Sequence, residues 1–355
     1  MELVSYQEYL AYSEMVKYVF LLIGLIAFFY YNKNIDMEPL SKLSVWVLVL
    51  MMVVLLGGWP MIEGGIDRNI YYAEAEYIAR TRTTERMNDP GYFFVNYLLT
   101  LFPMNLYFYL HAFVYVIGIY IFAKSIFPRQ YGALFIAMIL YFQFVSYGVN
   151  TMRAGLAGSF VLIALSFRER RLLEWTLLFV AVMIHKSFAL PVLCYLIADR
   201  YDRTDLFFRI WLLSIPLSAV AGGFFQSHFA GLLGDESRVS YLTTAAQDTH
   251  YQVGFRIDFI LFSCAPIVMG YYLIYKRGFQ DRFYKTLFNT YLLANTFWIF
   301  VIRANFSDRF AYLSWFIYCP VLLYPLLKNP EIVPNSHKWV AFSILALTLF
   351  RTYLS

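Results

Sequence analysis

The amino-acid sequence predicts an all-α polytopic membrane protein with about twelve transmembrane helices, in a range of about 10 to 13. Hydrophobic residues form 61% of its 355 residues and charged residues only 14%, and the mean hydropathy is +0.58. Soluble domains have a smaller apolar share and a larger charged share. Long apolar runs recur along the chain, and Lys and Arg gather in the short loops between them, as in cytoplasmic loops. We expect a single integral membrane domain over residues 1–355.

The charge and the cysteines exclude other classes of protein. The net charge of +5 is explained by basic cytoplasmic loops and does not indicate nucleic-acid binding. Cys194, Cys264 and Cys319 all lie inside apolar runs, so we expect packing residues and neither disulfides nor a metal site. The first residues lack the basic region of a cleavable signal, so the first apolar segment should remain as a span.

The first quarter of the chain is expected to cross the membrane twice and then form a polar outer loop. Residues 16–31 follow an acidic lead and precede lysines, which places the acidic end outside. Residues 44–62 return the chain to the outer face, where Asp67 stands just past the span and the polar loop continues to Asp89-Pro-Gly91. Residues 92–102 are too short to cross, because a span needs about 20 helical residues. We expect an interfacial or re-entrant helix there.

The middle of the chain predicts two further crossings that lead to a polar corner. Residues 104–122 should run inward and residues 131–147 outward to Asn150 and Arg153. Asn150 is expected to be the N-cap of the next helix, which puts Arg153 in the first helical turn. A cation is disfavoured by the helix dipole at this end, whereas an arginine and free backbone N–H groups together can bind an anion. The alternative is an arginine that reaches the membrane surface and ends a span.

The second half alternates short spans with polar loops. The cluster Arg168-Glu-Arg-Arg171 marks the cytoplasmic side. Residues 172–198 are long for one span and short for two, and contain His185, so we expect two short or broken helices that meet at this histidine. Residues 226–254 should form the second polar outer loop, with Arg238 and Tyr241. The remaining spans are expected at residues 210–225, 255–275, 286–302, 310–327 and 339–354.

Polar side chains gather at the predicted outer ends of spans and in the outer loops. Ionisable residues near the membrane are costly and are therefore functional candidates, but each also has a structural interpretation. Asp67 can be a helix cap, His185 a buried hydrogen-bonded histidine, and Arg309 the partner of Asp308. The outer candidates are Asp67, Arg153, His185, Arg238, Arg303, Asp308 and Arg309.

These residue types suit chemistry on a lipid-linked pyrophosphate, and the motifs of soluble enzymes are missing from the sequence. Arginine binds phosphate oxygens through two parallel hydrogen bonds and stabilises the charge that develops on a pyrophosphate leaving group. A carboxylate or a histidine beside it can deprotonate an acceptor hydroxyl. We expect Asp67 or His185 to be this catalytic base and favour Asp67, because Tyr71, Tyr72 and Tyr77 follow it and offer faces for a sugar ring.

At these residues the chain resembles the EpsG family of exopolysaccharide polymerases, which are related in role to the Wzy O-antigen polymerases. The resemblance runs in order through Asp67-x-x-x-Tyr71, Asp89-Pro-Gly91, Asn150-x-x-Arg153-x-x-x-Ala157, His185-Lys-Ser187 and Asp308-Arg309-x-x-Tyr312. It implies that oligosaccharide repeat units carried on undecaprenyl pyrophosphate are polymerised at the outer face of the bacterial inner membrane. C-type glycosyltransferases resemble this chain in placing an acidic residue, here Asp67, in the first large outer loop.

The expected site therefore combines a catalytic group with residues that bind pyrophosphate and sugar, and uses no cofactor or metal. The binding residues are expected to be Tyr71, Asn150, Arg153, Arg238, Tyr241, Arg303, Asp308 and Arg309. The resemblance implies lipid-linked donor and acceptor, the lipid bilayer, and a chain-length regulator and a flippase of the same pathway as partners. Capsule and O-antigen synthesis are included among its implied roles.

Two other classes of function remain open at this point. A lipid-linked oligosaccharide flippase would have a charged central cavity and two pseudo-repeated halves, but the sequence has no convincing repeat. A membrane O-acyltransferase that modifies polysaccharide could use His185 as its base, although its acyl donor usually arrives from the cytoplasm. Deleting the gene separates these readings, because only loss of a polymerase leaves single repeat units on the lipid.

Overall fold

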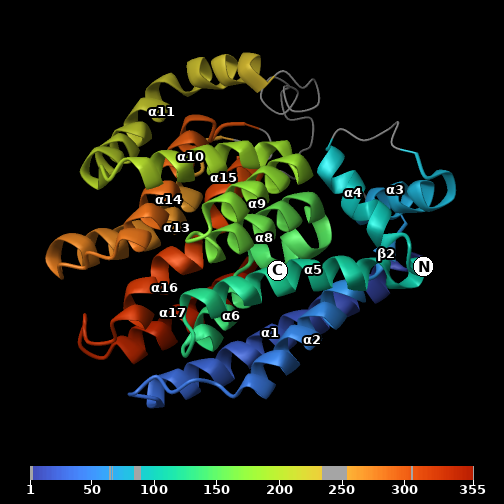
Figure 1. Ribbon diagram of the computed structural model, residues 1–355, viewed down its shortest axis with the longest axis horizontal. Coiled ribbons are helices and arrows are strands. Elements are labelled where there is room, and N and C mark those ends of the chain that lie inside the picture. Colours follow the sequence, from blue (N-terminus) through green and yellow to red (C-terminus); the bar gives the residue numbers. More distant parts are fainter. Residues whose placement is uncertain are drawn as a thin grey trace. The chain divides into compact units, whose positions relative to one another are not determined.

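The computed structural model describes residues 3–63, 65, 67–83, 89–233, 254–304 and 307–354, and it is built almost entirely of helices (Figure 1). Among these residues, two short parallel strands, β1 (Leu3–Val4) and β2 (Met61–Ile62), form a small sheet. The chain divides into two compact units. Unit 1 contains Met1–Phe188 and Leu326–Ser355, and unit 2 contains Ala189–Pro325.

Unit 1 holds the helices of the first half of the chain together with the last helix. In chain order they are α1 (Tyr6–Lys33), α2 (Lys42–Gly57), α3 (Asp67–Thr81), α4 (Pro90–Leu99), η1 (Met104–Leu106), α5 (Tyr107–Ile126), α6 (Tyr131–Leu140), α7 (Gln143–Val145), η2 (Ser146–Asn150), α8 (Met152–Ser166), α9 (Arg171–Ile184), η3 (Lys186–Phe188) and α17 (Ser336–Leu354).

Unit 2 holds α10 (Ala189–Arg200), α11 (Thr204–Leu233), α13 (Ile257–Tyr271), η4 (Tyr272–Lys276), α14 (Arg282–Phe300), α15 (Ser307–Trp315) and most of α16 (Tyr318–Lys328). The buried amide of Asn295 ties its helices together. Asn295 accepts a hydrogen bond from Trp211 Nε1 of α11 at 2.8 Å and donates to Ser263 of α13 and Ser314 of α15 at 3.2 and 3.1 Å. Four helices therefore meet at one satisfied polar group, which specifies their register.

The ends of several helices follow from local sequence. Ser5 and Glu8 form a capping box, so α1 begins ten residues before the apolar run that was predicted as a span. Asn150 is not the N-cap of α8, contrary to our prediction. It ends η2, Thr151 takes the N-cap position without a side-chain cap bond, and Arg153 still lies in the first turn. The break predicted at His185 is confirmed, because α9 ends at Ile184 and His185 is its extended C-cap.

The apolar helices make this a multi-pass membrane protein, but the structure does not support about twelve crossings. Among the described residues, five helices are long and apolar enough to span: Tyr6–Lys33, Met104–Ile126, Thr204–Phe225, Ile257–Lys276 and Ser307–Lys328. A sixth is possible if α6 and the segment Gln143–Asn150, bent by 80°, form one broken span. The other predicted spans lie in helices that are either not apolar enough, such as α14 and α17 with 19 residues each, or too short. At 16 and 15 residues, α2 and α8 are about 22 to 24 Å long, less than the ~30 Å hydrocarbon core.

The last helix packs against the first within unit 1. A Cβ at Gly24 of α1 would overlap the side chain of Thr348 of α17, so only glycine allows this approach. The buried Arg351 of α17 places its guanidinium carbon 3.5 Å over the ring of Phe20. Its Nη1 also donates to the main-chain oxygen of Ile139 in α6, at 3.2 Å. The helix α17 is thus an integral part of unit 1.

Candidate functional site

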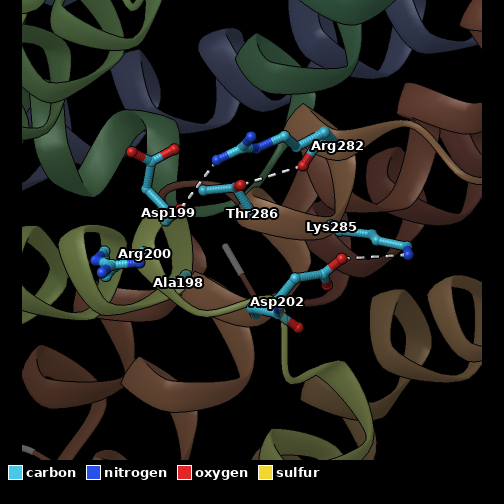
Figure 2. Close-up of a pocket in the computed structure, with 8 residues that line it drawn as sticks. Ala198, Asp199, Arg200, Asp202, Arg282, Lys285 and Thr286 are labelled. Atoms are coloured by element: carbon cyan, nitrogen blue, oxygen red, sulfur yellow. Dashed lines mark hydrogen bonds and ion pairs between the residues drawn. The ribbon is translucent and has the colours of Figure 1, made fainter.

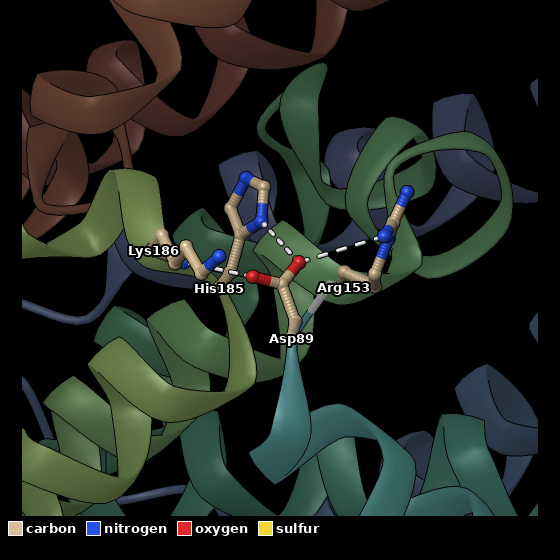
Figure 3. A network of polar contacts seen from close by, with 4 residues as sticks. All are labelled: Asp89, Arg153, His185 and Lys186. Carbon is tan, nitrogen blue, oxygen red and sulfur yellow. Dashed lines mark hydrogen bonds and ion pairs between the residues drawn. The ribbon is translucent and has the colours of Figure 1, made fainter. Parts of the chain in front are cut away.

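A buried carboxylate at the start of α4 is the centre of a polar cluster in unit 1. The side chain of Asp89 is 2% exposed and occupies the N-cap position of α4, yet it makes no hydrogen bond to its own helix. Its Oδ2 lies 3.5 Å from Arg153 Nη1 and 3.5 Å from His185 Nδ1, and its Oδ1 accepts from the main-chain N–H of Lys186 at 3.4 Å (Figure 3). We call these four residues the Asp89 cluster.

Glycine at position 91 allows α4 to bring Asp89 to this place. Helix α4 packs against α9, and a Cβ at Gly91 would lie 2.6 Å from the main-chain carbon of Met183 and 2.7 Å from the amide nitrogen of Ile184. Real Cβ contacts of this length to backbone do not occur, so any larger residue would push the two helices apart. Pro90 at the first helical position is preset for a helix start and lacks an N–H that would need a partner. The sequence Asp89-Pro-Gly91 thus delivers the carboxylate to the end of α9.

His185 reaches the carboxylate because the helix breaks there. Its backbone is extended, with φ of −151° and ψ of 107°, and its side chain is 21% exposed. The ring presents Nδ1 to Asp89 and Nε2 to the opposite side (Figure 3). A carboxylate beside one ring nitrogen favours the tautomer with the proton on that nitrogen, in which the other nitrogen has the lone pair that can accept a proton.

Arg153 contacts the cluster from the first turn of α8. Its side chain is 34% exposed, and its guanidinium carbon lies 5.7 and 5.9 Å from the ring centroids of Tyr71 and Tyr92. Those two rings pack edge to face, with centroids 5.9 Å apart. The tyrosine faces attract the cation and restrict its motion, while part of the guanidinium stays accessible to a ligand.

A second carboxylate, Glu74, belongs to the same surroundings. It lies one helical turn after Tyr71 on α3, and its Oε2 is buried without a hydrogen-bond partner among the described residues. Burial raises the pKa of Glu74 above its usual value; the charge of Arg153 opposes this rise and that of Asp89 adds to it. Glu74 therefore lies within electrostatic reach of the Asp89 cluster.

The two carboxylates have pKa values that move in opposite directions. Burial alone would raise the pKa of Asp89. The hydrogen bond and charge of His185, with the charge of Arg153, favour the carboxylate more strongly and hold the pKa below its usual value. The pKa of Glu74 is instead raised by burial. Such a divergence between neighbouring acids is typical of sites that separate proton donors from charged groups.

A pocket of about 270 Å³ includes Asp67, which lies four residues before Tyr71 on α3, and Asn150, which ends η2 three residues before Arg153. Aromatic rings of Tyr9 and Trp59 line it beside these polar groups. Its full lining is Tyr9, Trp59, Pro60, Met61, Ile62, Gly65, Asp67, Arg68, Asn69, Val149 and Asn150. Aromatic faces with amide and carboxylate groups at the edge suit a sugar ring.

Arg68 in this pocket is a buried cation. Its Nη2 donates to the main-chain oxygens of Leu56 and Gly57 at 3.2 and 2.9 Å, and its guanidinium carbon lies 3.6 Å over the Phe108 ring. Its Nε and Nη1 are buried without a hydrogen-bond partner among the residues that the structure describes. Arg68 thus adds a positive charge to the lining of the pocket, which favours an anionic ligand.

The structure brings together some of the predicted site residues. Arg153, His185 and Tyr71 lie around Asp89, while Asp67 and Asn150 line the neighbouring pocket. Arg303, Asp308 and Arg309 lie in unit 2. There Arg303 Nη2 donates to the main-chain oxygen of Ala219 at 2.8 Å, and the other two occupy the first turn of α15. Arg238 and Tyr241 lie outside the described residues.

Neither Asp89 nor Glu74 is among the site residues predicted from the sequence. The Asp-Pro-Gly sequence at position 89 is a common helix start, so the sequence predicts an aspartate that caps its own helix. In the structure the carboxylate makes no such cap bond. The usable signal for Glu74 is its spacing of seven residues from Asp67 and three from Tyr71, which places all three on one face of α3. Among the described residues, no group of three or more His, Cys, Asp or Glu side chains is arranged to hold a metal ion.

Comparison with known proteins identifies the chain at the level of a family. No curated protein and no solved structure matches it. Its sequence matches the EpsG family over residues 43–354, a range that contains the Asp89 cluster and the neighbouring pocket, apart from the Tyr9 side of that pocket. The chain is therefore a member of the EpsG family.

Proposed function

We propose that this protein is a surface-polysaccharide polymerase that joins oligosaccharide repeat units carried on undecaprenyl pyrophosphate. Reaction is proposed at the outer face of the bacterial inner membrane, in a single integral membrane domain. Family membership supports the polymerase role. The observation that carries the proposal is the contact of one buried carboxylate with both a histidine and an arginine, at 3.5 Å each.

The geometry favours His185 over Asp67 as the catalytic base. Asp89 lies against the Nδ1 side of the ring, and Nε2 is proposed to accept the proton of a substrate hydroxyl. The lowered pKa of Asp89 keeps this carboxylate charged and able to stabilise the imidazolium that results. Asp67 instead opens α3 at the edge of the pocket, where it is suited to accept a hydrogen bond from a sugar.

Arg153 is proposed to bind the pyrophosphate of the donor. A guanidinium that is one-third exposed and backed by two tyrosine rings can donate to phosphate oxygens without leaving its place. Negative charge grows on the leaving pyrophosphate during glycosyl transfer, so a fixed arginine stabilises the transition state more than the ground state. The pocket beside Trp59 is proposed to hold a sugar of the acceptor.

In the proposed step, the anomeric carbon of the donor loses its bond to the pyrophosphate oxygen and gains a bond to the acceptor hydroxyl oxygen. The hydroxyl proton passes to Nε2 of His185, and the electron pair of the broken bond leaves with the pyrophosphate beside Arg153. The free energy released on transfer from the glycosyl–pyrophosphate bond of the lipid-linked donor drives the step, so a nucleotide sugar is not required.

The test uses purified full-length protein in proteoliposomes with lipid-linked repeat units, and measures chain growth and donor binding separately. His185→Gln and Asp89→Asn should each slow chain growth by about 10² to 10⁴ while donor binding persists, because general-base help has about that value. Asp67→Asn should retain the larger part of the rate. Arg80→Gln removes an exposed charge that pairs with Glu76 on α3, and serves as the control.

The outcomes separate the possible roles. Normal chain growth by His185→Gln together with loss in Asp67→Asn would return the role of base to Asp67. A flippase would move the lipid-linked units across the membrane without lengthening them, and an O-acyltransferase would add acyl groups to them. Accumulation of single repeat units on lipid in a deletion strain is expected only for the polymerase.

A further inference from the structure

A second polar pocket lies wholly within unit 2, between the end of α10 and the first two turns of α14 (Figure 2). Its volume is about 240 Å³, and we call it the α10–α14 pocket. The residues that line it are Ala198, Asp199, Arg200, Asp202, Arg282, Lys285, Thr286 and Asn289. None of them belongs to the Asp89 cluster or to the proposed catalysis.

Among the described residues, one buried side chain of this pocket has no hydrogen-bond partner. Asn289 is 1% exposed, and both its Nδ2 and its Oδ1 are buried without a hydrogen bond among the described residues. A buried amide left in this way costs free energy comparable to a lost hydrogen bond or more. Since Asn289 lines the pocket, a ligand there that carries both an acceptor and a donor would satisfy both atoms.

Two of the cations that line the pocket, Lys285 and Arg282, make long contacts to protein oxygens. Lys285 Nζ lies 3.5 Å from Asp202 Oδ2, and the Asp202 side chain is mostly exposed. Arg282 Nη2 donates to the main-chain oxygen of Asp199 at 3.4 Å (Figure 2). With Arg200, three cations line the pocket beside two carboxylates, which leaves an excess of positive charge. Arginine, lysine and an amide donor together are the groups that bind phosphate oxygens.

The neighbouring sequence places this pocket at the end of a membrane span. The candidate span Thr204–Phe225 begins two residues after Asp202. Tyr201 is exposed beside the pocket, and Tyr271, Tyr272 and Tyr275 are exposed at the end of α13 and in η4. Tyrosines that follow a span end are typical of the level of lipid head groups.

We propose that the α10–α14 pocket binds the head group of an anionic phospholipid through a phosphate that carries a hydroxylated group. The phosphate oxygens accept from Arg282, Lys285 and Asn289 Nδ2, and a head-group hydroxyl donates to Asn289 Oδ1. The proposal is independent of the polymerase function, because it rests on unit 2 alone.

The experiment uses purified full-length protein and native mass spectrometry after exposure to equal amounts of phosphatidylglycerol and phosphatidylcholine. The unaltered protein should retain phosphatidylglycerol selectively. Asn289→Leu and Arg282→Gln should each reduce that retention about tenfold, since each removes hydrogen bonds to a charged group. Arg277→Gln is the matched control, because Arg277 is exposed, contacts Tyr272 and does not line the pocket.

Thermal unfolding checks that Asn289→Leu folds. Arg282→Gln, at the rim of the pocket, tests the pocket independently of the Asn289→Leu variant. Calorimetry with sn-glycerol 3-phosphate tests a soluble source of the same chemistry. Equal retention of both lipids, or equal retention by Arg277→Gln and the two pocket variants, would overturn the proposal. Glycerol phosphate that binds as tightly as the lipid would refute the lipid as the source.

Discussion

Arg153 owes its proposed role to the shape of its guanidinium as well as to its charge. It stands between a buried carboxylate and two tyrosine rings, a place that a planar cation fills better than an ammonium group. We therefore expect Arg153→Lys to reduce chain growth by at least about tenfold while protein abundance in the membrane holds. Chain growth assays on proteoliposomes with equal amounts of protein check this. Normal growth by the lysine variant would make Arg153 an anchor only.

Glu74 gives a prediction about stability and pH. Its raised pKa means that folding favours the protonated form, so ionisation costs stability as pH rises from the ordinary glutamate pKa through the higher folded value. Glu74→Gln mimics the neutral form. It should raise the thermal unfolding midpoint at neutral pH by about 1 to 3 °C, and the gain should vanish at acid pH, below the ordinary glutamate pKa. If Glu74→Gln were less stable than the parent protein at neutral pH, the Glu74 carboxylate would be shown to stabilise the folded protein through its interaction with Arg153.

The sequence predicts the residues of the site better than their partners. Arg153 and His185 stand out because a charge at the edge of an apolar run is costly, and composition alone shows that cost. Asp89 could not be assigned in the same way, since an aspartate before Pro-Gly has an ordinary explanation as a cap. Its contacts with Arg153 and His185 join positions 64 and 96 residues away along the chain, and no local pattern encodes such pairs.

At the level of helices, the close approach of α4 to α9 sets the position of the cluster. Gly91→Ala would place a methyl group within 2.6 Å of the backbone of α9 and should destabilise the protein by about 1 to 3 kcal/mol. It should also lower chain growth, because Asp89 would move away from His185. Gly223→Ala in α11 is the control, since nothing lies within 4 Å of the added methyl group.

The two glycine variants are compared by thermal unfolding in detergent and by chain growth in proteoliposomes. Equal stability and activity of the two variants would contradict the close packing of α4 on α9.

The helix break at His185 is the feature at this level that the sequence predicts best. An apolar run that is long for one span and short for two, with a polar centre, fits few other arrangements of helices. The end of η2 at Asn150 was harder to predict, since Thr151 and Asn150 are both acceptable caps.

At the level of the whole molecule, apolar composition predicted more spans than the described helices support. Hydropathy does not distinguish a helix that faces lipid from one that is covered by protein. The apolar window of Ser307–Lys328 is 89% buried within the protein, whereas that of Tyr6–Lys33 is only 22% buried. Hydropathy also does not fix helix length, and the apolar helices α2 and α8 have only 16 and 15 residues. The family and the membrane class were therefore predictable, and the count was not.

Orientation in the membrane is open to a direct test. A reporter fused after Arg171 or after Arg282 should report the cytoplasm, because both positions lie in basic segments. A reporter inserted within residues 226–254 should report the outside. Fusions that place residues 226–254 in the cytoplasm would overturn the proposed orientation of the reaction, whatever the outcome for the α10–α14 pocket.

The packing of α17 on α1 also has a consequence for biosynthesis. About 300 residues separate these helices, so a ribosome working at roughly 5 to 20 residues per second delivers α17 roughly 15 to 60 s after α1. Throughout that interval the Gly24 face of α1 lies against lipid or an insertion factor, because α17 has not yet been made. Unit 2 is therefore synthesised before the helices of unit 1 are complete. Nascent chains that stop before α17 should therefore expose the Gly24 face of α1 and become substrates for membrane proteases.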